Sequence, residues 1–335
     1  MKKVLFATTA LVFSAGIAAA EVSVGGDGRM GVVYNGSDWN FSSRVRVSFT
    51  ASGTTDGGLE FGGSIRADNA GGGAAGTAGS VYISGAFGKL SMGDVVGASE
   101  ALFGDFYEVG YTDLSSQNTI PGSGTGFSND ILYLTGDNGG NVGSSITPIT
   151  GTGTTATGIA VANTGPNLLY TGTFGAFSVA ASMSDGKAGS VSENQEYAVA
   201  GAYTFGNYTV GLGYEYLDGT GATWTAAGFS GKADMITLAG VAQFGNTSVK
   251  AGVAHIGKDL DADWYGIGAS SVFGATTVGG YVQHIEDNNA NMDVTWYGLG
   301  AEYDLGGGAS IKGGVADNDL SGSDMVADLG VKFSF

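Results

Sequence analysis

The sequence has no cysteine, only three prolines and only two histidines among its 335 residues. Without cysteine, neither a disulfide framework nor a thiolate metal site can form. Charged residues are scarce at 13%, whereas glycine occurs 63 times. Glycine destabilises a helix interior by roughly 0.5–1 kcal/mol per residue but suits tight turns and close-packed sheets, so a helical bundle is excluded. A hydrophobic content of 43% is too high for a disordered chain. The composition therefore predicts one large all-β fold.

The first twenty residues differ from the rest of the chain. Lys2 and Lys3 precede an apolar run that ends at Ile17, and alanines occupy positions 18–20. A basic start, an apolar stretch and small residues at its end are typical of a secretory signal peptide. A membrane anchor would need about eighteen apolar residues without polar interruption, and threonine and serine interrupt this run. We therefore expect a signal peptide at 1–20 and a mature domain at 21–335.

The mature chain is strongly acidic. Loss of Lys2 and Lys3 changes the formal charge from −18 to −20. Nucleic acid is not an expected partner, because phosphate contacts require a basic patch. After residue 20 no apolar run has the length of a transmembrane helix. An exported chain of this hydrophobicity is then either a soluble all-β protein or a membrane β-barrel.

Strand patterning distinguishes these two fold classes. From Trp39 to Ala51 every second residue is apolar or small, and the residues between them are polar or charged. The last segment, from Asp324 to Phe335, alternates in a similar way. Aromatic residues concentrate near strand ends, as in Tyr197–Phe205 and Tyr208–Tyr216. A soluble sandwich has no reason to border its apolar face with aromatic rings, whereas a barrel in a bilayer does.

A short turn containing glycine recurs along the chain. Five copies begin with Phe-Gly, at Phe87–Leu90, Phe174–Phe177, Phe205–Tyr208, Phe244–Thr247 and Phe273–Thr276. Ser52–Gly58 and Leu305–Ala309 resemble two more. Seven short turns at the end that also holds both termini predict a sixteen-stranded antiparallel transmembrane β-barrel. The opposite end is expected to carry longer polar connections, at 69–79, 185–196, 218–231, 257–263, 286–293 and 317–323.

One connection is much longer than the others. From Val95 to about Pro166 no alternating strand of adequate length is present, and long loops are usually functional or disordered. Its first half holds four carboxylates, Glu100, Asp105, Glu108 and Asp113, and its second half, 139–167, carries no charge. The first half also contains many apolar side chains that an outer surface has little reason to expose. We therefore expect this third long loop to fold into the barrel.

The chain has only four arginines, Arg29, Arg44, Arg46 and Arg66. The alternation directs all four inward from the first three strands. That direction is partly forced, since a charge on the lipid face costs roughly 2–4 kcal/mol near the bilayer midplane. Their concentration in one sector is not forced, and patches of arginine are one way in which pores sort charged solutes. We expect the arginines to face the four loop carboxylates across a narrowed lumen. Local ion pairs with Asp27, Glu60 or Asp68 are the alternative for any single arginine.

Signals for enzymatic chemistry are weak. Gly26–Gly31 matches a G-x-G-x-x-G pattern, but chance matches are expected at this glycine content and no strand-to-helix junction follows. His255 and His284 lie in separate strand regions without the spacing of a metal triad, and no G-x-S-x-G sequence is present. We predict that the protein is not an enzyme.

Four segments resemble the general diffusion porins of Rhodobacter-type α-proteobacteria: Asp38–Arg44, Glu100–Tyr111, Phe205–Gly211 and Leu329–Phe335. The resemblance implies a homotrimer of sixteen-stranded barrels in the outer membrane of a Gram-negative bacterium. It also implies that the third long loop is an inward-folded eyelet, with Glu100, Asp105 and Glu108 opposite the four arginines. Structural Ca²⁺ at acidic loop positions is a further implication, with no ligands assigned. Asp68 and the uncharged stretch 139–167 depart from the family pattern.

The leading hypothesis is a passive pore for small hydrophilic solutes and ions, surrounded by outer-membrane lipid and requiring no cofactor for transport. The alternative is a non-channel binding or adhesion protein of the outer membrane, acting through its long acidic outer loops. An outer-membrane hydrolase is a distant third. The loops alone do not separate the first two, whereas stepwise conductance in planar bilayers does.

Overall fold

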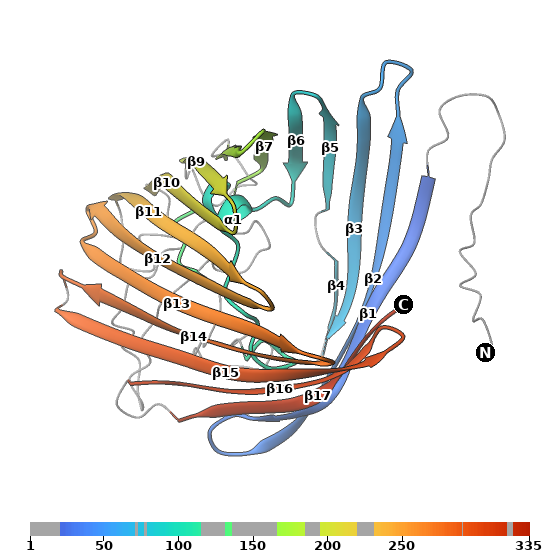
Figure 1. The fold of residues 1–335 in the computed structure, drawn as a ribbon, viewed down its shortest axis with the longest axis vertical. Coiled ribbons are helices and arrows are strands. Elements are labelled where there is room, and N and C mark those ends of the chain that lie inside the picture. Colours follow the sequence, from blue (N-terminus) through green and yellow to red (C-terminus); the bar gives the residue numbers. More distant parts are fainter. Residues whose placement is uncertain are drawn as a thin grey trace.

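The computed structural model describes residues 21–70, 73–76, 79–114, 131–135, 166–184, 195–219, 231–289, 291–319 and 324–335. The predicted signal peptide and most of the uncharged stretch 139–167 lie outside the described residues. Within them, seventeen strand segments form one antiparallel sheet in which the strands follow one another in chain order (Figure 1).

The strands are β1 (Glu21–Tyr34), β2 (Trp39–Thr54), β3 (Glu60–Ala70), β4 (Gly73–Gly76), β5 (Ser80–Gly85), β6 (Gly88–Gly93), β7 (Leu168–Phe174), β8 (Phe177–Met183), β9 (Gln195–Phe205), β10 (Tyr208–Gly219), β11 (Gly231–Phe244), β12 (Thr247–Lys258), β13 (Ala262–Phe273), β14 (Thr276–Asp287), β15 (Met292–Gly306), β16 (Ala309–Asn318) and β17 (Val326–Ser334). The described residues contain one helix, α1 (Ala98–Phe103). At six residues it is far too short to span a bilayer, and no described helix is long and apolar enough to do so.

The sheet closes into a barrel because β17 pairs back with β1. β4 and β5 both pair with β3, one along each half of it, so they are two pieces of one barrel strand. The ring therefore has sixteen strands, and the predicted sixteen-stranded antiparallel barrel is confirmed. Closure joins the first and last strands, so the sheet does not end in a free first or last strand.

The predicted alternation is visible in the exposure of the side chains. Phe41 on β2 is 95% exposed on the outside of the ring, whereas Arg29 on β1 is only 5% exposed. All four arginines have the opposite parity to the exposed apolar residues of their strands, as predicted. Aromatic rings pack against one another near the turn end of β9, β10 and β11, where Phe205, Tyr208 and Phe244 are in contact.

Four of the five predicted Phe-Gly turns lie where the sequence places them. At Phe87–Leu90 the turn residues are Ala86 and Phe87 instead, and Gly88 already pairs with Gly85. Gly175, Gly206, Gly245 and Gly274 have φ values of 65°, 59°, 61° and 64° as the first central residue of their turns. A positive φ at this position only is the pattern of a type II′ hairpin, which glycine adopts without strain.

Three of the predicted long connections are shorter than expected. β12 and β13 are joined by 259–261 alone, and β14 and β15 by 288–291. β4 lies within the connection predicted at 69–79. The reason is that backbone pairing continues after the apolar alternation has ended, as at the polar pair Asp263 and Glu286.

Candidate functional site

The stretch 95–114, which follows β6, packs against the inward-facing side of the wall. Its side chains Val95, Phe103, Phe106, Val109 and Tyr111 are each at most 7% exposed. Helix α1 lies against β7 to β11 (Figure 1). The apolar side chains of this stretch are therefore covered by the barrel wall.

Glycines in the wall make room for the aromatic rings of this stretch. Each ring contacts an inward-facing glycine on a different strand: Phe103 on Gly211 of β10, Phe106 on Gly268 of β13, Tyr107 on Gly279 of β14 and Tyr111 on Gly330 of β17. A β-carbon at any of these glycines would come within 2.8 Å of the ring. We call these four pairs the glycine contacts. They require the absence of a side chain at the wall position.

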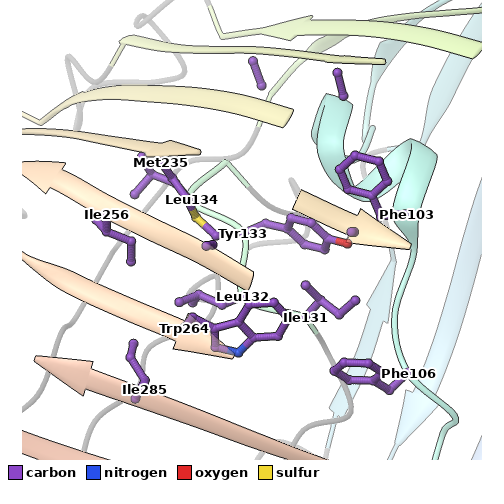
Figure 2. Close-up of a cluster of buried hydrophobic side chains, with 14 of the residues drawn as sticks. Phe103, Phe106, Ile131, Leu132, Tyr133, Leu134, Met235, Ile256, Trp264 and Ile285 are labelled. Atoms are coloured by element: carbon purple, nitrogen blue, oxygen red, sulfur yellow. The ribbon is translucent and has the colours of Figure 1, made fainter. Parts of the chain in front are cut away.

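A second short stretch, 131–135, completes the buried cluster. Ile131, Leu132, Tyr133 and Leu134 lie among apolar side chains of the wall, including Met235, Ile256 and Trp264 (Figure 2). The rings of Phe106 and Trp264 are stacked with centroids 6.3 Å apart, and Tyr281 is 6.2 Å from Phe106. Burial of apolar surface at roughly 25 cal/mol per Å² makes this cluster the main attachment of both stretches to the wall.

Three charged wall residues hold the backbone of the same stretches. Asp328 on β17 accepts hydrogen bonds from the amides of Tyr111 (3.1 Å) and Thr112 (2.8 Å) and from the Thr112 hydroxyl (2.6 Å). Glu215 on β10 accepts from the amide (2.7 Å) and hydroxyl (3.1 Å) of Thr135. Each of these carboxyl groups accepts two or three hydrogen bonds from neighbouring amide and hydroxyl groups, so these side chains fix where the backbone lies.

A lysine does the same with carbonyl groups. Lys250 on β12 donates from Nζ to the backbone oxygens of Phe103 and, at 2.6 Å, Asp105. The stretch 95–114 is thus held to the wall by apolar packing and by hydrogen bonds to both an acidic and a basic side chain.

The wall and the stretch 95–114 together line a cavity of about 510 Å³. Charged side chains from both contribute to its lining: Asp27, Arg29, Arg44, Arg46, Glu108, Asp113, Glu302 and Lys332. Cations and carboxylates thus meet inside the barrel at the place where the stretch crosses β17 and β1. We call this the charged cavity.

The cations of the charged cavity are ordered by strand register. Arg44 on β2, Arg29 on β1 and Lys332 on β17 lie directly opposite one another in the sheet. Like charges in opposite positions destabilise a sheet. In the neighbouring row Arg46 lies between Asp27 and Asp68, and its ion pair with Asp68 is 3.0 Å long.

Glu108 is the carboxylate that meets the lysines of the wall. It lies 3.0 Å from Nζ of Lys332 and 3.5 Å from Nζ of Lys312 on β16. Burial acts to raise the pKa of Glu108, but Lys312 and Lys332 outweigh it, so the pKa lies below its ordinary value. Burial, together with the nearby Glu302 and Glu108, raises the pKa of Tyr107 to about 12. Near neutral pH Glu108 is therefore ionised, and the preceding residue Tyr107 is neutral.

Five of the eight predicted site residues line the charged cavity: Arg29, Arg44, Arg46, Glu108 and Asp113. The other three lie elsewhere. Arg66 on β3 forms an ion pair with Asp68 at 2.7 Å, and Glu100 lies on α1. Asp105 accepts a hydrogen bond from the amide of Ile131 through Oδ1.

Glu108 lines the same cavity as three of the arginines, but its ion pairs are with lysines. Three of the arginines instead form ion pairs with carboxylates of the wall, Asp27 and Asp68. These are the local pairs that the sequence offered as the alternative. They form because strand register brings Asp27 and Asp68 next to the arginines.

A sequence profile described as Gram-negative porin matches residues 7–323. The chain belongs to the Gram-negative porin family. Porin barrels of Gram-negative bacteria lie in the outer membrane, and the family consists of channels rather than enzymes. Family membership does not favour the alternative of a non-channel adhesion protein.

Known porins resemble this chain over almost all of its length. A porin from Rhodobacter capsulatus is 53% identical over 338 residues, covering 94% of this chain and 100% of that protein. A solved porin structure, refined at 1.8 Å resolution, has 50% sequence identity and a TM-score of 0.74, covering 94% of this chain and all of that one. A mutant porin from Rh. blastica, at 19% identity and a TM-score of 0.62 with the same coverage, shares the fold.

The porin sequence contains functional candidates that the sequence analysis missed, namely Lys312, Lys332 and Asp328. The signal was available, because Asp328 and Lys332 have the inward parity of the last strand. Inward-facing lysines are cationic partners as well as arginines. Lys312, at 3% exposure, is among the most buried charged residues of the barrel.

The resemblance to porins also implied calcium. Among the described residues no group of three or more histidine, aspartate or glutamate side chains is arranged to hold a metal ion. Backbone and amide oxygens also bind Ca²⁺, so structural calcium stays a prediction.

Proposed function

We propose that the chain is a general diffusion porin whose selectivity is set at the charged cavity. Small hydrophilic solutes and ions would cross the outer membrane passively through water inside the barrel. The observation that carries this proposal is the meeting of Arg29, Arg44 and Arg46 with Glu108 and Asp113 inside a closed sixteen-stranded ring.

The mechanism requires no nucleophile and no redox chemistry. The stretch 95–114 occupies part of the barrel interior and narrows the path. Cations on β1, β2 and β17 and carboxylates on this stretch and on β15 produce an electric field across that path. The field orients a solute that has a dipole. An apolar solute has no favourable interaction with the field that would compensate for its lost hydration.

Planar-bilayer recording tests the channel itself. Purified protein should produce stepwise increases of conductance in KCl. If no such steps appear, the proposal is contradicted.

Replacement of both Arg44 and Arg46 by neutral residues should shift the reversal potential in a KCl gradient toward cation selectivity. An unchanged reversal potential would place these arginines away from the path of the ions.

We further propose export through a signal peptide at 1–20 and assembly as a homotrimer. Outward positions on β5 and β6, Val81, Ile83, Leu90 and Met92, mix aliphatic side chains with few aromatic rings, as suits protein contact. N-terminal sequencing of the protein from the outer membrane should give a sequence that begins at Glu21. Sedimentation in mild detergent should give the mass of three chains, and a single-chain mass would contradict the trimer.

A further inference from the structure

One cation of the charged cavity has few partners. Arg44 forms one ion pair, from Nη2 to Oδ2 of Asp27, at 3.5 Å. Its Nε is buried and makes no hydrogen bond within the described part of the chain. A guanidinium carries five N–H donors. Most of the donor capacity of Arg44 is therefore unused, although the side chain is only 9% exposed.

The neighbours of Arg44 add to its positive charge. Arg29 lies directly opposite it on β1, and Arg46 is two residues along the same strand. In a site so poorly exposed, water screens these repulsions less than it does at a surface. Asp27, itself partly exposed, is the only carboxylate in an ion pair with Arg44 within the described residues. An anion beside Arg44 would relieve this repulsion.

The charged cavity separates its charges by position. Three arginines and one carboxylate, Asp27, come from β1 and β2, and Lys332 comes from β17. Glu302 comes from β15, and Glu108 and Asp113 come from the stretch 95–114. Four cations and four carboxylates line it, so it has no formal net charge. An anion is therefore attracted only by the local positive charge beside the arginines of β1 and β2.

We propose that Arg44, with Arg29 and Arg46 beside it, is a docking site for the oxyanion of a permeating solute, a carboxylate or phosphate group. The planar guanidinium fork matches two oxygens of such a group, which a spherical chloride ion cannot exploit. The cavity of about 510 Å³ has room for a small solute that carries the group. The solute docks and leaves without any bond being made or broken. This inference rests on the proposed function, because the solute reaches the site through the channel.

Single-channel recording at constant ionic strength tests the proposal. Potassium phosphate replaces KCl in steps at pH 7.5, and potassium acetate does so in a parallel series. We expect the chloride current to fall along a saturable curve, because a docked oxyanion occupies the path. If the current saturates with both probes, the site binds oxyanions in general. If it saturates with phosphate alone, the site binds phosphate groups.

Arg44→Gln removes the fork and should raise the half-saturating phosphate concentration at least about tenfold, the effect of losing a charge-assisted hydrogen bond. Lys89→Gln is the matched control, because it also removes one inward-facing cation. Lys89 lies on β6 with Nζ 4.2 Å from the centroid of the Tyr82 ring, away from the charged cavity. This control should keep the half-saturating concentration of the original protein.

Arg44→Lys keeps the positive charge but not the planar fork, and it decides the question if Arg44→Gln does not fold. It too should weaken phosphate docking. The inference would be overturned if Arg44→Lys kept the half-saturating phosphate concentration of the original protein. It would also be overturned if the current followed bulk conductivity without saturation. Both results need a conducting channel, so they are distinct from failure of the proposed function, in which no conductance is seen.

Discussion

At the scale of single residues, Glu108 shows how neighbours determine a charge state. Burial favours its neutral form, but Lys312 and Lys332 lower its pKa below the ordinary value. A carboxylate with a lowered pKa contributes its full stabilisation above the unfolded-state pKa of about 4.3 and loses it as the pH falls through the lower folded-state pKa. The Glu108 contacts therefore persist at a pH where an exposed glutamate is half protonated.

Reversal potentials in a KCl gradient should report this charge. Glu108→Gln removes a negative charge from the charged cavity, so selectivity should shift toward anions at pH 7. The difference between variant and original protein should persist down to about pH 4 and disappear only below it, where Glu108 itself is protonated. Glu60→Gln, an exposed glutamate of β3, is the control with the same chemical change. Identical reversal potentials for Glu108→Gln and the original at pH 7 would contradict this assignment.

Sequence could predict the direction of the arginines, but it offered Asp27 and Asp68 only as alternative partners and missed Lys332 as their neighbour. Direction depends on alternation within one strand, which is local, and Arg29 beside the exposed Met30 shows it clearly. Partnership depends on register between strands that are far apart in sequence. Arg29 and Lys332 are opposite one another only because the last strand closes onto the first.

At the scale of elements, the hydrogen bonds of Asp328 to Tyr111 and Thr112 position the end of the stretch 95–114. Asp328→Asn keeps the size of the side chain but loses the charge and half of its acceptors. We expect roughly 1–3 kcal/mol of lost stability, together with larger fluctuations of the open-channel current. Thermal unfolding in detergent and single-channel noise measure the two effects.

Asp304→Asn is the control for Asp328→Asn. Asp304 is exposed near a turn and accepts one hydrogen bond, from the amide of Gly306 at 2.7 Å. A general effect of lost charge would appear in both variants. Quiet channels in Asp328→Asn would show that this carboxylate does not position the stretch.

The glycine contacts give a second prediction at this scale. In Gly268→Ala the new β-carbon would lie 2.6 Å from Cδ1 of Phe106, so the ring must move. Overpacking of this kind costs typically about 1–3 kcal/mol. In Gly240→Ala, on β11, the nearest atom is 3.4 Å away, and stability should change little. Equal unfolding temperatures for the two variants would contradict the packing described for Phe106.

Turns were easier to predict than the longer connections. A Phe-Gly turn is specified by glycine at one position, so its sequence determines it locally. The ends of β12 and β13 are determined by pairing between their backbones, and polar residues such as Asp263 join that ladder without any apolar signal.

At the scale of the whole molecule, closure of the ring depends on β17. Its pairing with β1 includes reciprocal backbone hydrogen bonds between Gly26 and Phe335, of 2.7 and 3.0 Å. A chain that ends at residue 323 would leave backbone groups of β1 and β16 unpaired in lipid, at a cost of several kcal/mol for each group. We expect no heat-modifiable folded band on electrophoresis from this truncated chain. A folded band of normal mobility would contradict the role of β17 in closure.

The number of strands could be predicted because turns can be counted. The path of the stretch 95–114 could not, since nothing in its own sequence states which strands it crosses. That information is divided between its aromatic residues and the glycines of the wall, such as Phe106 and Gly268, whose complementarity appears only after folding.

In mechanical terms, the glycine contacts turn the stretch 95–114 into an internal brace. A thin cylindrical shell resists flattening poorly, and it stiffens when a member is fixed to its inner circumference at separated points. Phe103, Phe106, Tyr107 and Tyr111 supply such points on β10, β13, β14 and β17. We therefore expect the brace to bear lateral pressure from the surrounding bilayer together with the strands. The cross-section of the barrel at the charged cavity should then change little when lipid packing changes.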